Sequence, residues 1–120
     1  MNNKELIYKL LWSTIEDYVG LWELHWEVNT ALKVVSNLNK EFVKKTLQYF
    51  LDANLVKFYY DKWGDAQLQE INRQEAMEII NGDRFWLPPA INDWCVKVGS
   101  TEKGEKFYNE ELIDDFMQRL

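Results

Sequence analysis

The residue types that most often carry catalysis are scarce in this sequence. It contains one histidine, His25, and one cysteine, Cys95, which fall on different predicted elements. A cysteine–histidine nucleophile needs both side chains in contact, and a zinc site needs several such ligands close together. The five glycines are scattered and form no phosphate-binding loop. We therefore expect no catalytic residue, metal site or cofactor, and structural roles for His25 and Cys95.

Carboxylates, in contrast, are plentiful and occur in pairs. The pairs are Glu16–Asp17, Glu23 with Glu27, Glu110–Glu111 and Asp114–Asp115. Some hydrolases place two carboxylates across a cleft, but these pairs fall on predicted helix faces that should be exposed. Solvated acidic faces are the simpler interpretation, and the chain is not expected to be an enzyme.

Tryptophan residues lie among several of these acids. Trp22 and Trp26 are four residues apart, so they share a helix stripe, beside Glu23 and Glu27. Most tryptophans are expected in the core. Trp63 falls in a predicted turn, and the sequence does not decide whether its side chain is buried or exposed. An exposed indole there would be an interface anchor. The expected partner contacts are Asp61, Trp63 and Asp65 first, and Glu110, Glu111, Asp114 and Asp115 second.

The net charge of −6 is unevenly distributed along the chain. Residues 33–60 carry five lysines against two acids, a net +3, whereas residues 1–32, 61–100 and 101–120 each carry −3. An acidic protein repels phosphate at long range and attracts basic surfaces. The charge therefore favours a basic protein as partner, or simply keeps the chain soluble.

Length and composition are those of a single domain over 1–120. The 120 residues are 47% hydrophobic and 15% aromatic, which is enough for one core. A lone cysteine excludes an internal disulfide and favours a reducing compartment. The start lacks a basic-then-apolar segment, and the apolar runs are far shorter than the roughly 20 residues of a membrane span. We expect a cytoplasmic protein without membrane contact.

Apolar spacing predicts a mainly helical chain with two main strands. The expected elements are helices over 4–18, 21–32, 40–53 and 73–81, strands over 55–60 and 94–99, and a last helix capped by Thr101. Gly20 is expected to end the first helix, Asn39 to cap the third, Asn72 to cap the helix over 73–81, and Asn54 to adopt a left-handed turn. The two strands are expected to pair antiparallel around an excursion that contains its own helix.

Two segments carry a family resemblance. The segment KKTLQYFLDANLVKFYY (44–60) resembles the recognition helix and first wing strand of winged-helix regulators. The segment VKVGSTEKGEKFY (96–108) resembles their second wing strand and the helix that follows. The resemblance implies an α+β, mainly helical fold with three N-terminal helices, a small antiparallel sheet and a C-terminal helix. The excursion over 61–92 is longer than a simple wing. Winged helices bind DNA, RNA or proteins, so the fold alone does not choose a function.

A DNA-binding transcription regulator is the alternative function, with residues 36–49 in the major groove. The outward face of the third helix, opposite its apolar side, holds Glu41, Lys44, Lys45, Gln48 and Asp52. Charges on this face cancel, and it has no arginine to read bases. The residues expected to contact DNA under this alternative are Asn39, Lys40, Lys44 and Lys45.

The preferred interpretation is a non-enzymatic protein-binding module. Small size, acidity and the lack of a catalytic set resemble bacterial immunity proteins, which neutralise toxic and often basic nuclease domains. This resemblance is one of general character, and no functional residue is carried over from it. It implies an inhibitor that occludes a basic toxin or nuclease domain by an acidic, aromatic surface. The partner's identity and the oligomeric state stay open.

Overall fold

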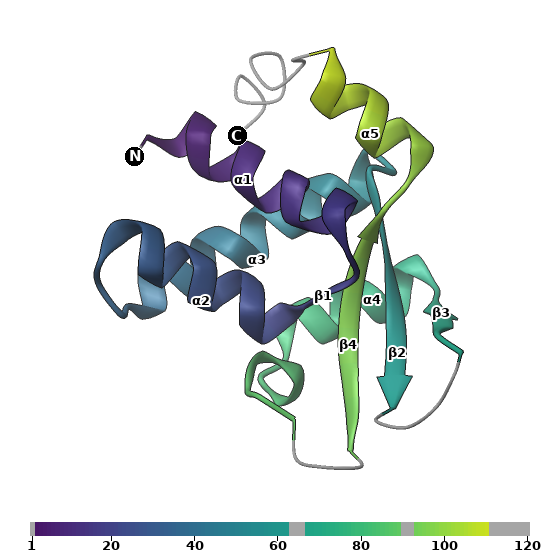
Figure 1. The fold of residues 1–120 in the computed structure, drawn as a ribbon. Helices are drawn as coiled ribbons and strands as arrows, with labels where there is room; N and C mark the ends of the chain where they lie inside the picture. The colour runs from purple at the N-terminus through teal and green to yellow at the C-terminus, as the bar shows by residue number, and fades with distance from the viewer. Residues whose placement is uncertain (1, 63–66, 90–92, 111–120) are drawn as a thin grey trace.

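The computed structural model describes residues 2–62, 67–89 and 93–110 (Figure 1). The elements are α1 (Asn3–Glu16), β1 (Val19–Gly20), α2 (Leu21–Leu32), α3 (Asn37–Asp52), β2 (Val56–Lys62), β3 (Gln69–Ile71), α4 (Arg73–Asn81), the 3₁₀ turn η1 (Arg84–Trp86), β4 (Trp94–Ser100) and α5 (Glu102–Asn109). The described chain is thus α+β and mainly helical, with three helices before the long strands and one after them.

The described strands form one antiparallel sheet in the order β1–β4–β2–β3. β2 and β4 pair along their whole length, from Val56 opposite Ser100 to Lys62 opposite Trp94. This register confirms the expected pairing of the two main strands. The two-residue β1 adds to the edge of β4, and β3 adds to the other side of β2. The excursion between β2 and β4 contains α4, as expected.

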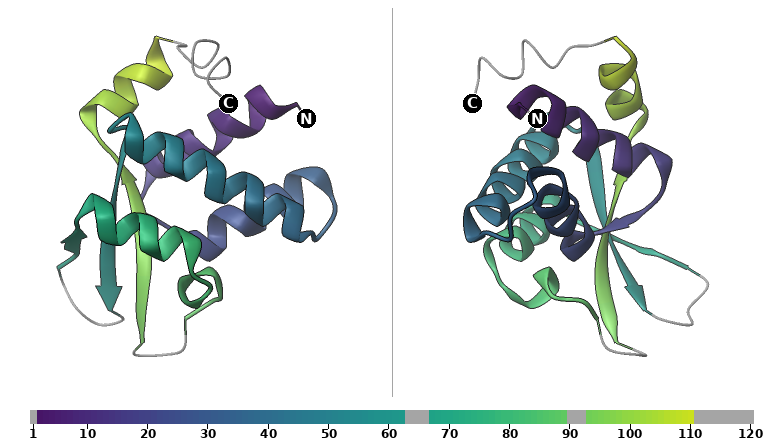
Figure 2. Two further views of the ribbon diagram at one scale, coloured as in Figure 1. Left: turned by 180° about the vertical axis from the view of Figure 1, so that it is seen from behind. Right: turned by 60° about the vertical axis from the view of Figure 1, so that its left-hand side comes forward.

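Helices α1 to α4 lie on one side of this sheet, which is clearest in the right-hand view of Figure 2. The core fills the space between the helices and the sheet. Its largest fully buried side chains include Phe50 of α3 and Phe58 of β2. Val43, Leu47 and Phe50 are buried together on one side of α3, as their spacing predicts.

Two of the expected helix boundaries are wrong. α3 begins at Asn37 because Ser36 is its cap, with the Ser36 Oγ accepting a bond of 3.0 Å from the Leu38 N–H. Asn39 is instead buried inside the first turn. Gly20 does not end α1, which stops at Glu16; it is the cap residue of α2, where its N–H donates to Glu23 at 3.3 Å.

The other expected caps are confirmed. Asn54 has a φ of 60°, the left-handed conformation expected after α3. The Thr101 Oγ1 accepts a bond of 3.0 Å from the Gly104 N–H at the start of α5. Asn72 caps α4 in the same way, through a bond of 2.9 Å from the Glu75 N–H. Local side-chain chemistry therefore sets the start of both of these helices.

Candidate functional site

The partner contacts expected from sequence lie mostly outside the described residues. Trp63, Asp65, Glu111, Asp114 and Asp115 all fall in those undescribed segments. Asp61 is half-buried near the end of β2, with one carboxylate oxygen 3.6 Å from the Lys97 Nζ. Glu110 is exposed just after α5 and lies 4.0 Å from the Lys106 Nζ. The two described acids therefore each face a lysine of the same chain.

The outward face of α3 is partly covered: Glu41 and Lys45 are exposed, as expected, but other side chains contact the excursion. Three side chains on or beside this face reach α4 or the turn that follows α4. The Lys40 Nζ lies 3.2 Å from Asp83, the Gln48 amide donates to Asn81 at 3.1 Å, and Asp52 pairs with Arg73. Sequence reasoning missed this because helix periodicity does not show where an excursion folds back.

The four proposed DNA contacts are accordingly not a free basic surface. Asn39 is buried, and Lys40 is engaged by Asp83. The Lys44 ammonium lies 5.8 Å from the centre of the Trp86 ring and 4.0 Å from Glu41. Lys45 alone of the four is exposed.

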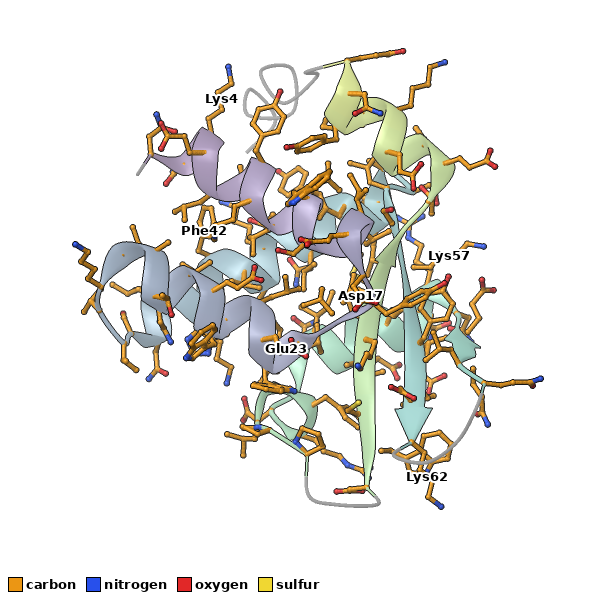
Figure 3. All side chains as sticks on the ribbon, viewed as in Figure 1. Lys4, Asp17, Glu23, Phe42, Lys57 and Lys62 are labelled. Carbon is orange, nitrogen blue, oxygen red and sulfur yellow. The ribbon has the colours of Figure 1, made fainter. Side chains whose placement is uncertain are left out.

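A pocket with acidic walls forms where α1, β1 and α2 meet. It has a volume of about 160 Å³ and is lined by Ser13, Glu16, Asp17, Tyr18, Val19, Glu23 and Glu27. Figure 3 shows Asp17 and Glu23 at this junction. We call this feature the acidic pocket. The pairs Glu16–Asp17 and Glu23 with Glu27, separate in the sequence, are thus brought to one place.

Glu27 is partly buried in the wall of the acidic pocket. Its Oε2 accepts a bond of 2.7 Å from the Ser13 hydroxyl. Burial raises the pKa of Glu27, and the nearby charges of Glu23 and Glu16 raise it further, against the opposing effects of Ser13 and Lys9. The simple interpretation of a fully solvated acidic face is therefore wrong for Glu27.

Replacing Glu27 by glutamine is expected to stabilise the domain at neutral pH. The folded pKa lies above the unfolded value of 4.5, so the wild type loses stability as the pH rises from 4.5 through the folded pKa. Glutamine removes this loss and keeps an acceptor for Ser13. We expect a gain of at most about 1 kcal/mol at pH 7, because solvent screens a half-buried group, and no gain near pH 4.

Urea unfolding at several pH values measures this difference. Glu102→Gln on the exposed start of α5 is the matched control for the loss of one surface carboxylate. A constant difference between Glu27→Gln and the wild type from pH 4 to 7 would contradict the argument.

Trp26 is exposed on the outer face of α2, although sequence reasoning favoured the core for most tryptophans. The buried residues of this helix are Leu21, Leu24 and Val28, which leaves Trp26 on the opposite side with 62% of its surface exposed. Trp86, in contrast, is buried and donates its indole N–H to the Ile80 carbonyl at 3.1 Å. Trp26 is the most exposed of the five tryptophans that the structure describes.

A second concave site, the aromatic groove, lies between the sheet and η1. It has a volume of about 300 Å³ and is lined by Tyr60, Gln69, Arg84, Phe85 and Trp94. The Tyr60 ring centre lies 5.9 Å from that of Phe85 and 6.1 Å from that of Trp94. These aromatics come from three elements, so no sequence spacing could have grouped them.

The chemistry of the aromatic groove is that of binding rather than of proton transfer. The Tyr60 hydroxyl donates to Glu75 at 2.6 Å. Burial, together with this bond, raises the pKa of Tyr60 to about 12. A phenol that keeps its proton at neutral pH is a poor general base.

Comparison with known proteins adds no guide to the function of this chain. No protein-family model, curated protein or solved structure matches the chain. The function has to be inferred from the surfaces that the fold presents.

His25 and Cys95, the two residues considered first for catalysis, each lie against groups of the protein's own fold. The His25 Nε2 lies 3.2 Å from the Ser36 carbonyl oxygen. Cys95 is half-buried on β4, and burial raises the pKa of its thiol, which disfavours the reactive thiolate. Within the described ranges, no group of three His, Cys, Asp or Glu side chains could hold a metal ion. None of the helices described there is long and apolar enough to cross a membrane.

Proposed function

We propose that this chain is a non-enzymatic protein-binding module, of the immunity type, that occludes a basic toxin or nuclease domain. One observation carries the proposal: the exposed Trp26 and the carboxylates Glu23 and Glu27 project from the same helix, α2. An accessible indole is a favoured interface anchor. Carboxylates beside it attract lysine and arginine side chains of a partner.

The proposed mechanism is steric and electrostatic. The net charge of −6 draws a basic partner into encounter. The indole of Trp26 then loses its water on contact, and the body of the domain covers the partner's active site. Inhibition of this kind needs no covalent step and no cofactor.

We also infer that the fold is of the winged-helix type. The order of three helices, two long antiparallel strands and a final helix supports this inference. Under it, α3 takes the place of the recognition helix and β2 and β4 take the place of the wing strands. The contacts of α4 with α3 leave less of that helix free for a DNA groove, which favours protein contact over DNA reading.

A DNA-binding regulator is the alternative proposal. It needs the outward face of α3 in a major groove, yet Gln48 and Asp52 on that face bond to Asn81 and Arg73 of α4. α4 would therefore have to move away before α3 could enter the groove. The overall acidity opposes DNA binding as well, so protein binding is preferred.

The tagged chain, used as bait in its native host at low ionic strength, tests the proposed function. We expect it to retain a basic protein, which is then identified by mass spectrometry, purified and mixed with the purified chain. Because the attraction is electrostatic, the association rate constant should fall by roughly tenfold or more as salt rises from about 0.02 to 0.3 M. Trp26→Ala should weaken the complex by roughly 30-fold, the effect of a hot spot of about 2 kcal/mol.

The matched control is Trp12→Ala, the same change at an exposed tryptophan of α1. A complex that is indifferent to both salt and Trp26→Ala would contradict the proposed interface. Tight binding of duplex DNA at about 0.15 M salt, lost on Lys40→Ala with Lys44→Ala, would instead promote the regulator alternative.

A further inference from the structure

Exposed apolar side chains gather at the turn between α2 and α3. They are Leu32, Val34, Val35 and Leu38, which we call the apolar tip. Val35 and Leu38 are 87% and 80% exposed, and Val34 is 52% exposed. Figure 1 shows this turn projecting from the left-hand end of the molecule. A single exposed leucine needs no explanation, but four apolar residues on one projecting turn mark a site of interaction.

A polar network beneath the apolar tip fixes its backbone. The Asn39 side-chain amide donates to the Asn29 Oδ1 at 2.8 Å and to the Val34 carbonyl at 2.9 Å. The same Asn29 oxygen accepts from the Ser36 N–H at 3.3 Å. The Ser36 carbonyl lies 3.2 Å from the His25 Nε2. These bonds order the turn in the free protein, so a partner does not bear the entropic cost of ordering it.

The backbone at the start of the turn is itself unusual. Lys33 has a φ of 57°, in the left-handed region that residues other than glycine seldom adopt. The N–H groups of Lys33 and Val34 bond to Thr30 and Asn29, which holds this conformation. The turn therefore presents apolar side chains on a backbone that the rest of the structure constrains.

The size and charge of the apolar tip argue against a second copy of the chain as its occupant. Four side chains are far fewer than the roughly 20–30 residues that a stable interface uses on each side. Two copies that each carry −6 also repel one another. The apolar tip must then be one part of a larger interface.

That larger interface is continuous with the surface already described. α2 ends at Leu32 in the apolar tip, and Trp26, Glu23 and Glu27 project from the same helix. We propose that the apolar tip inserts into an apolar pocket on the basic protein partner. This inference rests on the proposed function and adds to it the chemistry of the partner's surface. The acidic pocket would govern the rate of association, and the buried apolar tip the lifetime of the complex.

The test replaces Val35 and Leu38 by serine in one chain. Serine changes no charge, so it separates apolar contact from electrostatic steering. With the basic partner retained by the tagged chain, we expect the dissociation constant to rise by roughly 30-fold or more, almost entirely through faster dissociation. The salt dependence of association and the melting temperature should stay unchanged. Leu87→Ser is the matched control, because Leu87 is 70% exposed outside the apolar tip.

The possible outcomes are distinguishable. If the wild type and the double variant bind equally well, the inference about the apolar tip is overturned while the proposed function stands. If the wild type retains no basic protein, the proposed function fails, and the apolar tip as an anchor for such a partner fails with it. Light scattering that finds a wild-type dimer and a monomeric double variant would show that a second copy covers the apolar tip, which also overturns the inference.

Accessibility of the apolar tip can be checked without any partner. The dye 8-anilinonaphthalene-1-sulfonate should fluoresce more strongly with the wild type and with Leu87→Ser than with the double variant. Equal fluorescence from all three would mean that the apolar tip is not an accessible apolar surface, and the inference would be overturned.

Discussion

Phe50→Ala is expected to lower the free energy of unfolding by about 3–5 kcal/mol, the range for removing a fully buried phenylalanine. Phe50 has none of its surface exposed, and it lies on the side of α3 that faces the core. Its backbone carbonyl also accepts the Leu55 N–H at 2.8 Å, where the chain leaves α3 for β2. The alanine would leave a cavity where the helices meet the sheet. Urea unfolding followed by circular dichroism measures the loss.

The control for this experiment is Lys45→Ala on the exposed side of the same helix. Surface substitutions of this kind usually change stability by no more than about 0.5 kcal/mol. A loss below about 1 kcal/mol for Phe50→Ala would mean that the inward face of α3 is assigned wrongly. The side of α3 that faces DNA under the regulator alternative would then have to be reassigned too.

Periodicity and local capping explain why much of the fold was predictable. The inward face of α3, the pairing of β2 with β4 and the caps at Asn72 and Thr101 all depend on residues close in the sequence or on strongly apolar strands. The position of Asn39 was not predictable in the same way. Asn39 and Ser36 are both good cap residues, and the choice between them depends on Asn29, which lies on another helix.

The functional surfaces were harder to predict because they depend on how distant segments fold together. The acidic pocket joins carboxylates from both sides of the α1–α2 junction, and the aromatic groove joins rings from β2, η1 and β4. Val34 and Val35 fall between two helices that the apolar spacing predicts, so the spacing assigns them no role. The sequence contains these apolar residues, but it does not show that Asn39 bonds to the Val34 carbonyl and fixes the turn that carries them.

The contacts between α3 and the excursion bear on the proposed function. Under the proposed winged-helix fold, α3 would take the place of the helix that reads DNA. However, Lys40 and Asp52 of α3 form ion pairs with Asp83 and Arg73, which belong to the excursion. We therefore place the proposed partner surface on α2, with its carboxylates, Trp26 and the apolar tip.

Gly104→Ala is expected to destabilise the domain by about 3 kcal/mol or more, although the same change inside an ordinary helix is stabilising by about 1 kcal/mol. A Cβ at Gly104 would lie 2.1 Å from the Leu55 carbonyl oxygen and 3.1 Å from its carbonyl carbon. Both are backbone atoms of the residue just before β2. They cannot move aside as the end of a flexible side chain could.

The hydrogen bonds around Gly104 show why α5 cannot shift to relieve this overlap. The Thr101 N–H donates to the Leu55 carbonyl at 2.9 Å, and the Thr101 hydroxyl donates to the Asn54 carbonyl at 2.6 Å. The Thr101 Oγ1 in turn accepts the Gly104 N–H. A shift large enough to admit a methyl group would break these bonds together and detach α5 from the turn between α3 and β2.

Thermal and urea unfolding of Gly104→Ala beside Lys103→Ala test this argument, since Lys103 occupies the same turn of α5 and is exposed. Lys103→Ala should stay within about 0.5 kcal/mol of the wild type. Because α5 contacts α1 and β4 as well, the Gly104 variant should also lose amide protection along α5 before the rest of the domain unfolds. A Gly104→Ala domain more stable than the wild type would show that α5 does not pack against the backbone of Leu55.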